Sequence, residues 1–146
     1  IISAYHKRLF SSDPSERTLH AKAWAAWENA LASIDNDGAS IDSPADYALA
    51  FARLENHFFI NGCFLDEGQQ ILANMPRIAH IPGTIVQGRY DMICPPTSAF
   101  QLHKAWPSSK LHMIGRAGHA VSEPAISAEL VRTMNKLGRQ RQTLGL

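Results

Sequence analysis

Two residues of the kinds that carry out acid–base chemistry, Asp91 and His119, each follow a short apolar run. Asp91 comes just after the run TIVQG at 84–88, and His119 ends the turn GRAGH that follows KLHMI at 110–114. A carboxylate beside an imidazole fixes the ring's tautomer and stabilises the imidazolium that forms when histidine accepts a proton. We therefore interpret Asp91 as the orienting acid and His119 as the general base of a catalytic relay.

The elements that must position this pair have the order of a βαβ unit. We expect strands at 84–88 and 110–114, with a helix at 97–106 between them that Pro107 ends. A last helix comes after them, capped by Ser122 and stopped by Gly138. This order predicts parallel pairing with a right-handed crossover. Because reactive groups lie beyond the carboxyl ends of such strands, two residues 28 positions apart (119 − 91) are expected side by side.

The first half of the chain predicts helices and no strand before residue 80. Helical spacing covers 1–11, 13–33, 43–60 and 66–74, and Asp13-Pro14 and Ser43-Pro44 are both typical helix starts. The α/β pattern is therefore confined to the second half. Two parallel strands make a poor sheet alone, so we expect further strands from upstream sequence or from a partner chain.

The nucleophile that such a pair would serve is missing. The order Asp then His is that of α/β-hydrolases, in which a Gly-x-Ser-x-Gly turn comes first, and no such motif occurs in these 146 residues. The chain starts at Ile1 without an initiator Met. We expect a fragment. Taken singly, Asp91 could be a turn former or helix cap and His119 part of an ordinary tight loop; together they favour function.

Composition narrows the classes of partner and compartment. With 45% hydrophobic and 18% charged residues, a net charge of +1 and scattered Lys and Arg, the chain does not predict a nucleic-acid surface. No apolar run approaches the roughly 20 residues that span a bilayer. Cys63 and Cys94 suit neither a metal site nor a disulfide framework, so we expect free thiols in the cytoplasm. We assign Cys94 no catalytic role.

Two glutamates occupy unusual positions on helix faces rich in aromatic residues. Glu55 has Phe51 and Phe59 one turn before and after it, and Glu28 lies one turn after Trp24. A carboxylate in such surroundings is costly unless it is paired. Each glutamate could extend to water or pair with an arginine. Alternatively, the two could bind a cationic group of a ligand. No role is assigned to the other histidines, which we expect at the surface or hydrogen-bonded in the core: His6, His20, His57, His80, His103 and His112.

Several strings, in the same order along the chain, resemble the proline iminopeptidases, peptidases with the α/β-hydrolase fold. They are AKAWAAWE at 21–28, AFARLENHFF at 50–59, HIPGTIVQGRYDMIC at 80–94 and AWP at 105–107, followed by Gly118-His119. The resemblance covers nearly the whole chain. It is specific, because the helical strings do not belong to hydrolases in general.

The resemblance implies a serine peptidase that releases N-terminal proline from peptides, with no metal or organic cofactor. It implies Asp91 and His119 as triad members and Glu28 and Glu55 as ligands of the imino nitrogen of the proline, with Phe58 or Phe59 near its ring. Residues 1–75 would be part of a helical cap domain, and residues 76–146 the C-terminal part of the catalytic domain. The chain would need the N-terminal half of the same enzyme and would be inactive alone.

Two other hypotheses remain open from the residues. Another capped α/β-hydrolase, such as an esterase or epoxide hydrolase, would share Asp91 and His119 but would have no use for Glu28 and Glu55. A non-catalytic α/β interaction domain would use Asp91 and His119 only to hold its loops together.

Overall fold

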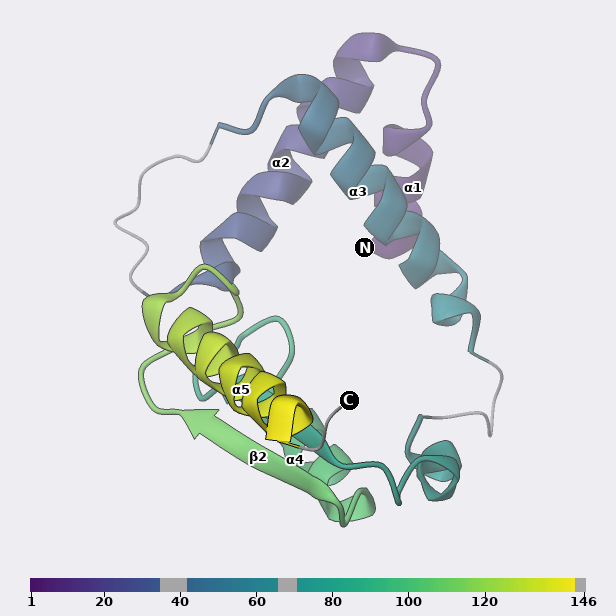
Figure 1. Cartoon of the computed structure of the whole chain (residues 1–146). Coiled ribbons are helices and arrows are strands. Elements are labelled where there is room, and N and C mark those ends of the chain that lie inside the picture. The colour runs from purple at the N-terminus through teal and green to yellow at the C-terminus, as the bar shows by residue number, and fades with distance from the viewer. Residues whose placement is uncertain (35–41, 66–70, 144–146) are drawn as a thin grey trace. The chain divides into compact units, whose positions relative to one another are not determined.

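The computed structural model describes residues 1–34, 42–65 and 71–143, and the side chains up to residue 140. The chain forms two compact units. The helical unit comprises Ile1–Ala30 and Asn36–Gln70, and the sheet unit comprises Leu31–Asp35 and Ile71–Leu146. Figure 1 shows their elements in chain order, from purple to yellow.

The helical unit contains α1 (Ile2–Leu9), all but the last two residues of α2 (Pro14–Ala32), α3 (Ala45–Ile60) and a short 3₁₀ turn, η1 (Gly62–Phe64). Its core is built largely from small residues that let the helices approach closely: Leu9, Ala21, Trp24, Ala25, Ala48 and Ala52. Fully buried Asn56 of α3 adds polar links to α1, because its Nδ2 donates to the Ile2 carbonyl at 3.0 Å and its Oδ1 accepts from His6 Nδ1 at 2.8 Å.

The two predicted helix starts fare differently. Asp13 precedes α2 as expected, and its Oδ1 accepts the Ser15 N–H at 2.8 Å. The expected Ser43 cap is wrong by one residue, since Pro44 holds the cap position and α3 begins at Ala45. Ser43 is buried instead, and its hydroxyl oxygen accepts from Asn29 Nδ2 of α2 at 3.4 Å. The serine therefore joins α2 to the start of α3.

Besides the end of α2, the sheet unit contains a 3₁₀ helix, η2 (Ile71–Arg77), followed by β1 (Gly83–Gly88), α4 (Pro96–Ala105), β2 (Ser109–Ile114) and α5 (Pro124–Thr143). The two strands pair in parallel, in a register that runs from Gly83 opposite Ser109 to Gly88 opposite Ile114. The predicted βαβ order and parallel pairing are confirmed. Residues 66–70 of the helix predicted at 66–74 lie outside the described residues. Residues 71–74 lie in the 3₁₀ helix η2.

Both predicted ends of the last helix are wrong. The helix begins at Pro124, so Ser122 lies outside it. The residue just before the helix is Glu123, whose carbonyl accepts the Ser127 N–H at 2.9 Å. Gly138 lies inside α5, with open space where a Cβ would be. A glycine ends a helix by adopting positive φ, and Gly138 is not among the described glycines that do so.

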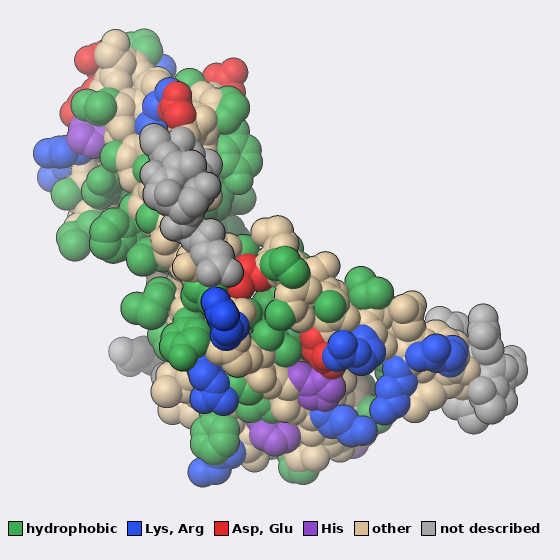
Figure 2. Space-filling model, turned by 90° about the vertical axis from the view of Figure 1, so that its left-hand side faces the viewer, with side chains coloured by type: hydrophobic (Ala, Val, Ile, Leu, Met, Phe, Trp, Pro, Cys, Tyr) green, Lys and Arg blue, Asp and Glu red, His purple; other side chains and the backbone are tan. Residues whose placement is uncertain are grey.

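Large apolar side chains are exposed on both units. Figure 2 shows hydrophobic surface on each, and the exposed residues include Trp27, Leu54, Met92, Val131 and Met134. Most of the apolar side of α5 is thus uncovered, although Ile126 is buried. Within the described ranges, no helix has the length and apolar character needed to cross a membrane.

Candidate active site

A tight turn after β1 presents Asp91 beside the loop that comes after β2. The Arg89 N–H donates to the Ile114 carbonyl and the Tyr90 N–H to the Ala117 carbonyl, both at 2.9 Å. Buried Gly88 permits this approach, because a Cβ there would lie 1.9 Å from the Gly118 carbonyl oxygen. The two strand ends are therefore held in direct backbone contact.

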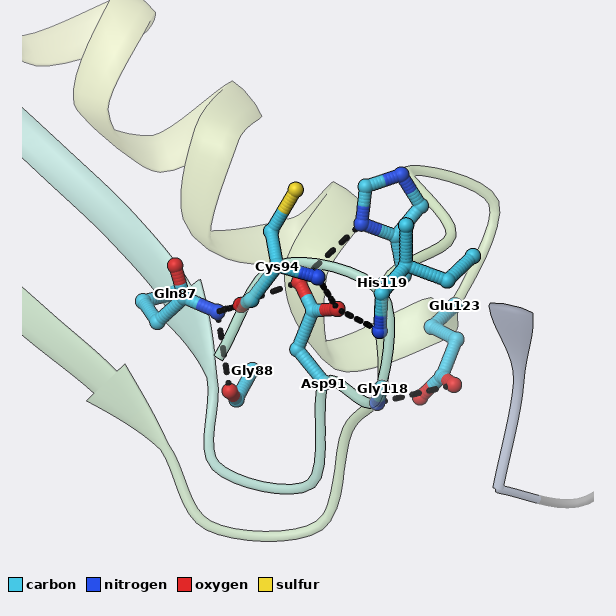
Figure 3. Close-up of polar contacts among 8 residues, drawn as sticks. Gln87, Gly88, Asp91, Cys94, Gly118, His119 and Glu123 are labelled. Carbon is cyan, nitrogen blue, oxygen red and sulfur yellow. Dashed lines mark hydrogen bonds and ion pairs between the residues drawn. The ribbon is translucent and has the colours of Figure 1, made fainter. Parts of the chain in front are cut away.

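The Asp91 carboxylate is 7% exposed and is surrounded by donors (Figure 3). Its Oδ1 accepts the backbone N–H groups of Ile93 at 3.0 Å and Cys94 at 2.7 Å. Its Oδ2 accepts from Gln87 Nε2 at 3.1 Å and from His119 Nδ1 at 3.0 Å. Donors of this kind fix the orientation of the carboxylate.

The His119 ring lies across this carboxylate with its side chain 40% exposed. Ionised Asp91 can only accept, so the 3.0 Å contact requires the proton on Nδ1 and leaves the lone pair on Nε2. No partner for Nε2 occurs within residues 1–34, 42–65 and 71–143. A half-exposed imidazole with a free lone pair and a buried carboxylate behind it is the geometry of a general base.

The backbone beside His119 is also held. The carbonyl of Ala32, at the end of α2, accepts the N–H groups of both His119 and Ala120 at 2.8 Å. The Gly118 N–H donates to the buried Glu123 carboxylate at 2.9 Å. The tight loop predicted at GRAGH is therefore anchored by residues from both sides of it in the chain.

Glu28 and Glu55 both lie in the helical unit, and Trp24 relates them. The Trp24 Nε1–H donates to Glu55 Oε2 at 2.8 Å. Trp24 also lines, with Glu28, a hollow of about 530 Å³ whose other walls are Ile1, Ile2, Tyr5, Ala23, Trp27 and Phe59. Among the described residues no Lys or Arg forms an ion pair with Glu55. Glu55 is thus bonded to an indole rather than neutralised by a cation.

Three of the remaining histidines have hydrogen bonds of 2.8 Å or shorter to described residues. His6 donates to Asn56, His103 Nδ1 contacts the Ser109 hydroxyl at 2.8 Å, and His112 Nδ1 donates to Glu129 at 2.5 Å. These are the bonded histidines that the sequence led us to expect. Cys63 and Cys94 are free and exposed. No group of three or more metal-ligating side chains occurs within the described part of the chain.

Two residues of this site were missed by reasoning from the sequence. Gln87 is a polar side chain in an otherwise apolar run, a signal that could have marked it as a ligand of a neighbouring group. Besides Asp91, its Nε2 contacts the Gly88 and Cys94 carbonyls at 3.1 Å. Glu123 gave no usable signal, because one of its partners is 89 positions away in the chain.

Comparison with curated proteins gives one consistent result. The chain is 47% identical to a protein named proline iminopeptidase from Xanthomonas citri over 134 residues, which cover 90% of the chain and 43% of that protein. It is 45% identical to one of the same name from Arabidopsis thaliana, covering 94% of the chain and 37% of the relative. The chain is related to the proline iminopeptidases. No family model matches it.

These matches cover most of the chain but less than half of each relative. A probable proline iminopeptidase from Leptolyngbya boryana, 45% identical, matches 97% of the chain but only 44% of its own length. The chain therefore spans about two-fifths of the length of these proline iminopeptidases. The resemblance seen in the sequence is confirmed.

Proposed function

We propose that the protein is a serine peptidase that releases N-terminal proline from peptides, and that this chain supplies its acid, its base and its proline-recognising carboxylates. The observation that carries the proposal is the 3.0 Å hydrogen bond between His119 Nδ1 and Asp91 Oδ2, in a chain related to proline iminopeptidases. The serine would come from a Gly-x-Ser-x-Gly turn in a part of the protein that precedes this chain.

His119 carries the proton through both halves of the reaction in this proposal. Its Nε2 takes the serine hydroxyl proton as the oxygen attacks the carbonyl carbon of the N-terminal proline, and the peptide C–N bond breaks as Nε2 returns that proton to the leaving amine. Water then attacks the prolyl ester by the same route. Buried Asp91 stabilises the imidazolium at each stage, because its carboxylate brings the opposite charge to the ring.

Glu28 and Glu55 would recognise the substrate through its charge. The N-terminal proline carries a secondary ammonium, which a carboxylate near apolar walls binds strongly because little water screens the pair. The support is the hollow lined by Glu28, Trp24 and Phe59 and the Trp24–Glu55 hydrogen bond. Its aromatic walls suit a pyrrolidine ring, and Phe59 is the better placed of the two phenylalanines because it is part of that lining.

The rest of the protein would complete both the sheet and the site. We propose that residues 1–75 belong to a helical cap and residues 76–146 to an α/β-hydrolase catalytic domain. Supporting this, β1 pairs with a single described neighbour, β2, and large apolar side chains of α5 are exposed. A parallel sheet is ordinarily covered on both faces. The 146-residue chain alone is expected to hydrolyse no prolyl substrate.

The test uses a fusion enzyme, in which the part of the Xanthomonas citri relative that precedes its match is followed by residues 1–146. We expect it to release the chromophore from a prolyl arylamide, while the chain alone does not. Replacing the proposed nucleophilic serine of the added part by alanine controls for contaminating peptidases. A folded fusion enzyme that cleaves an aryl ester but no prolyl arylamide would contradict the proposed substrate.

A further inference from the structure

A buried carboxylate that belongs to neither proposed pair lies against the His119 loop. Glu123 immediately precedes α5 and is 8% exposed. Its Oε1 accepts two backbone N–H groups, from Gly118 at 2.9 Å and from Ile34 at 3.0 Å. Gly118 is the residue before His119, and Ile34 lies two residues after the end of α2. One oxygen atom therefore joins two segments that are distant in the chain.

A second contact between the same segments lies beside the first. The Ala32 carbonyl accepts the His119 and Ala120 N–H groups, each at 2.8 Å. Little free space remains between them, because a Cβ built on Gly118 would lie 3.0 Å from both the Ala32 carbonyl oxygen and Glu123 Oε1. The backbone that carries His119 is thus held from both sides by the end of α2 and by Glu123.

This support matters because the imidazole is partly exposed. The His119 side chain is 40% exposed, and among the described residues its ring is held by the hydrogen bond to Asp91. The position of Nε2 consequently depends on where the loop backbone lies. An ionised carboxylate holds N–H groups more strongly than a neutral acceptor does. Without Glu123, two N–H groups would lose their acceptor where water has limited access.

We propose that Glu123 is a positioning residue, which sets the place of the His119 ring by tying its loop to the end of α2. The inference rests on the proposed function for the role of His119. Both segments that Glu123 joins belong to the sheet unit, which includes Leu31–Asp35. Glu123 acts through backbone N–H groups and touches no reacting atom.

Glu129 offers a matched control in the same part of the molecule. It is also 8% exposed and lies within α5, where it accepts from His112 Nδ1 and pairs with Arg132. Neither partner belongs to the His119 loop. Replacing Glu129 therefore removes a buried carboxylate and its hydrogen bonds but leaves the contacts of the His119 loop in place.

The experiment measures how fast a fluorophosphonate labels the serine of the fusion enzyme. In this reaction the serine oxygen bonds to phosphorus, fluoride leaves and His119 accepts the hydroxyl proton, so the rate reports the relay whatever peptide the enzyme prefers. Glu123→Ala, Glu123→Gln and Glu129→Ala are compared well below their melting temperatures, together with the kcat and KM for a prolyl arylamide and the kcat for an aryl ester.

Glu123→Ala is expected to slow labelling and both kcat values by about 10- to 100-fold, with KM unchanged within about twofold. Glu123→Gln should recover most of that rate, because its amide oxygen can still accept both N–H groups. Glu129→Ala should lower the melting temperature and leave labelling unchanged. Labelling that Glu123→Ala does not slow, or that Glu129→Ala slows equally, would overturn the positioning role. Loss of prolyl cleavage alone, with labelling and its dependence on Glu123 intact, would count against the proposed substrate and not against this inference.

Discussion

The two candidate pairs of this chain are built in contrasting ways. Asp91 and His119 lie on turns after adjacent parallel strands, where backbone contacts hold both loops and donors surround the carboxylate. Glu28 and Glu55 lie on helices, and Trp24 donates to one and lines a hollow with the other. The side chains of the first pair are already hydrogen-bonded to each other. In our proposal, the second supplies acceptors for the cation that the substrate brings.

In our proposal, this contrast separates chemistry from recognition. A relay must be in place before the substrate arrives, so its geometry is fixed by backbone hydrogen bonds and by buried Asp91. A recognition site gains affinity when a ligand's charge replaces a weaker partner, such as an indole N–H. Changes in the first region should therefore affect every substrate, whereas changes in the second should affect only substrates with an N-terminal proline.

Replacing the base should have the largest effect. In the fusion enzyme, His119→Ala is expected to lower the kcat for a prolyl arylamide and for an aryl ester alike, by roughly 10⁶-fold, because no other group takes the serine proton. His80→Ala, at an exposed histidine, is the control and should change neither. Steady-state assays with both substrates check this. Retention of ester cleavage by His119→Ala would break the comparison.

Removing the charge behind the base should come next. Asp91→Asn keeps the size of the side chain but presents an amide that can donate to Nδ1, which favours the wrong tautomer of His119. The expected loss in kcat is about 10⁴-fold for both substrates. Asp46→Asn, at an exposed position in the first turn of α3, is the control. An Asp91→Asn enzyme within tenfold of the parent would show that the hydrogen bond only supports the loop.

Neutralising a carboxylate of the proposed recognition site should lower hydrolysis of the prolyl arylamide and leave hydrolysis of the aryl ester unchanged. Glu55→Gln is expected to lower kcat/KM for the prolyl arylamide by about 30- to 150-fold, equivalent to about 2–3 kcal/mol, because a charged hydrogen bond to the ammonium is lost. Hydrolysis of the ester should not change. Glu16→Gln, also partly buried and in the first turn of α2, is the control. Equal losses on both substrates would remove Glu55 from recognition.

Removing the indole donor should have the smallest effect. Trp24→Phe deletes the N–H that holds Glu55 Oε2 and keeps an aromatic ring in its place. We expect about a tenfold loss of kcat/KM with the prolyl substrate, the scale of one hydrogen bond to a charged group. Trp27→Phe, in the wall of the same hollow, is the matched control. A loss after Trp27→Phe as large as that after Trp24→Phe would assign the effect to ring packing.

Features that nearby residues determine could be predicted from the sequence, whereas contacts between residues distant in the chain could not. The strands, their parallel order and the meeting of Asp91 with His119 followed from periodicity and from the rule that strand ends share an edge. The ends of α5 did not, because a glycine stops a helix only when its φ is positive, and that φ depends on the path of the later residues. Glu123 could not be found, since its partner Ile34 is joined to it only by the fold. The sequence showed that an unpaired Glu55 carboxylate would be costly among aromatic side chains. It did not show which of several aromatic residues would donate a hydrogen bond to it.

We infer that this chain holds a general relay in one unit and a proline-specific recognition site in the other. The ratio of prolyl arylamide to aryl ester hydrolysis, measured for the parent fusion enzyme and for its Glu55→Gln and His119→Ala variants, tests this division most directly. We predict that Glu55→Gln lowers the ratio by about the same 30- to 150-fold, while His119→Ala abolishes both activities together. A ratio unchanged by Glu55→Gln, or ester hydrolysis that survives His119→Ala, would contradict it.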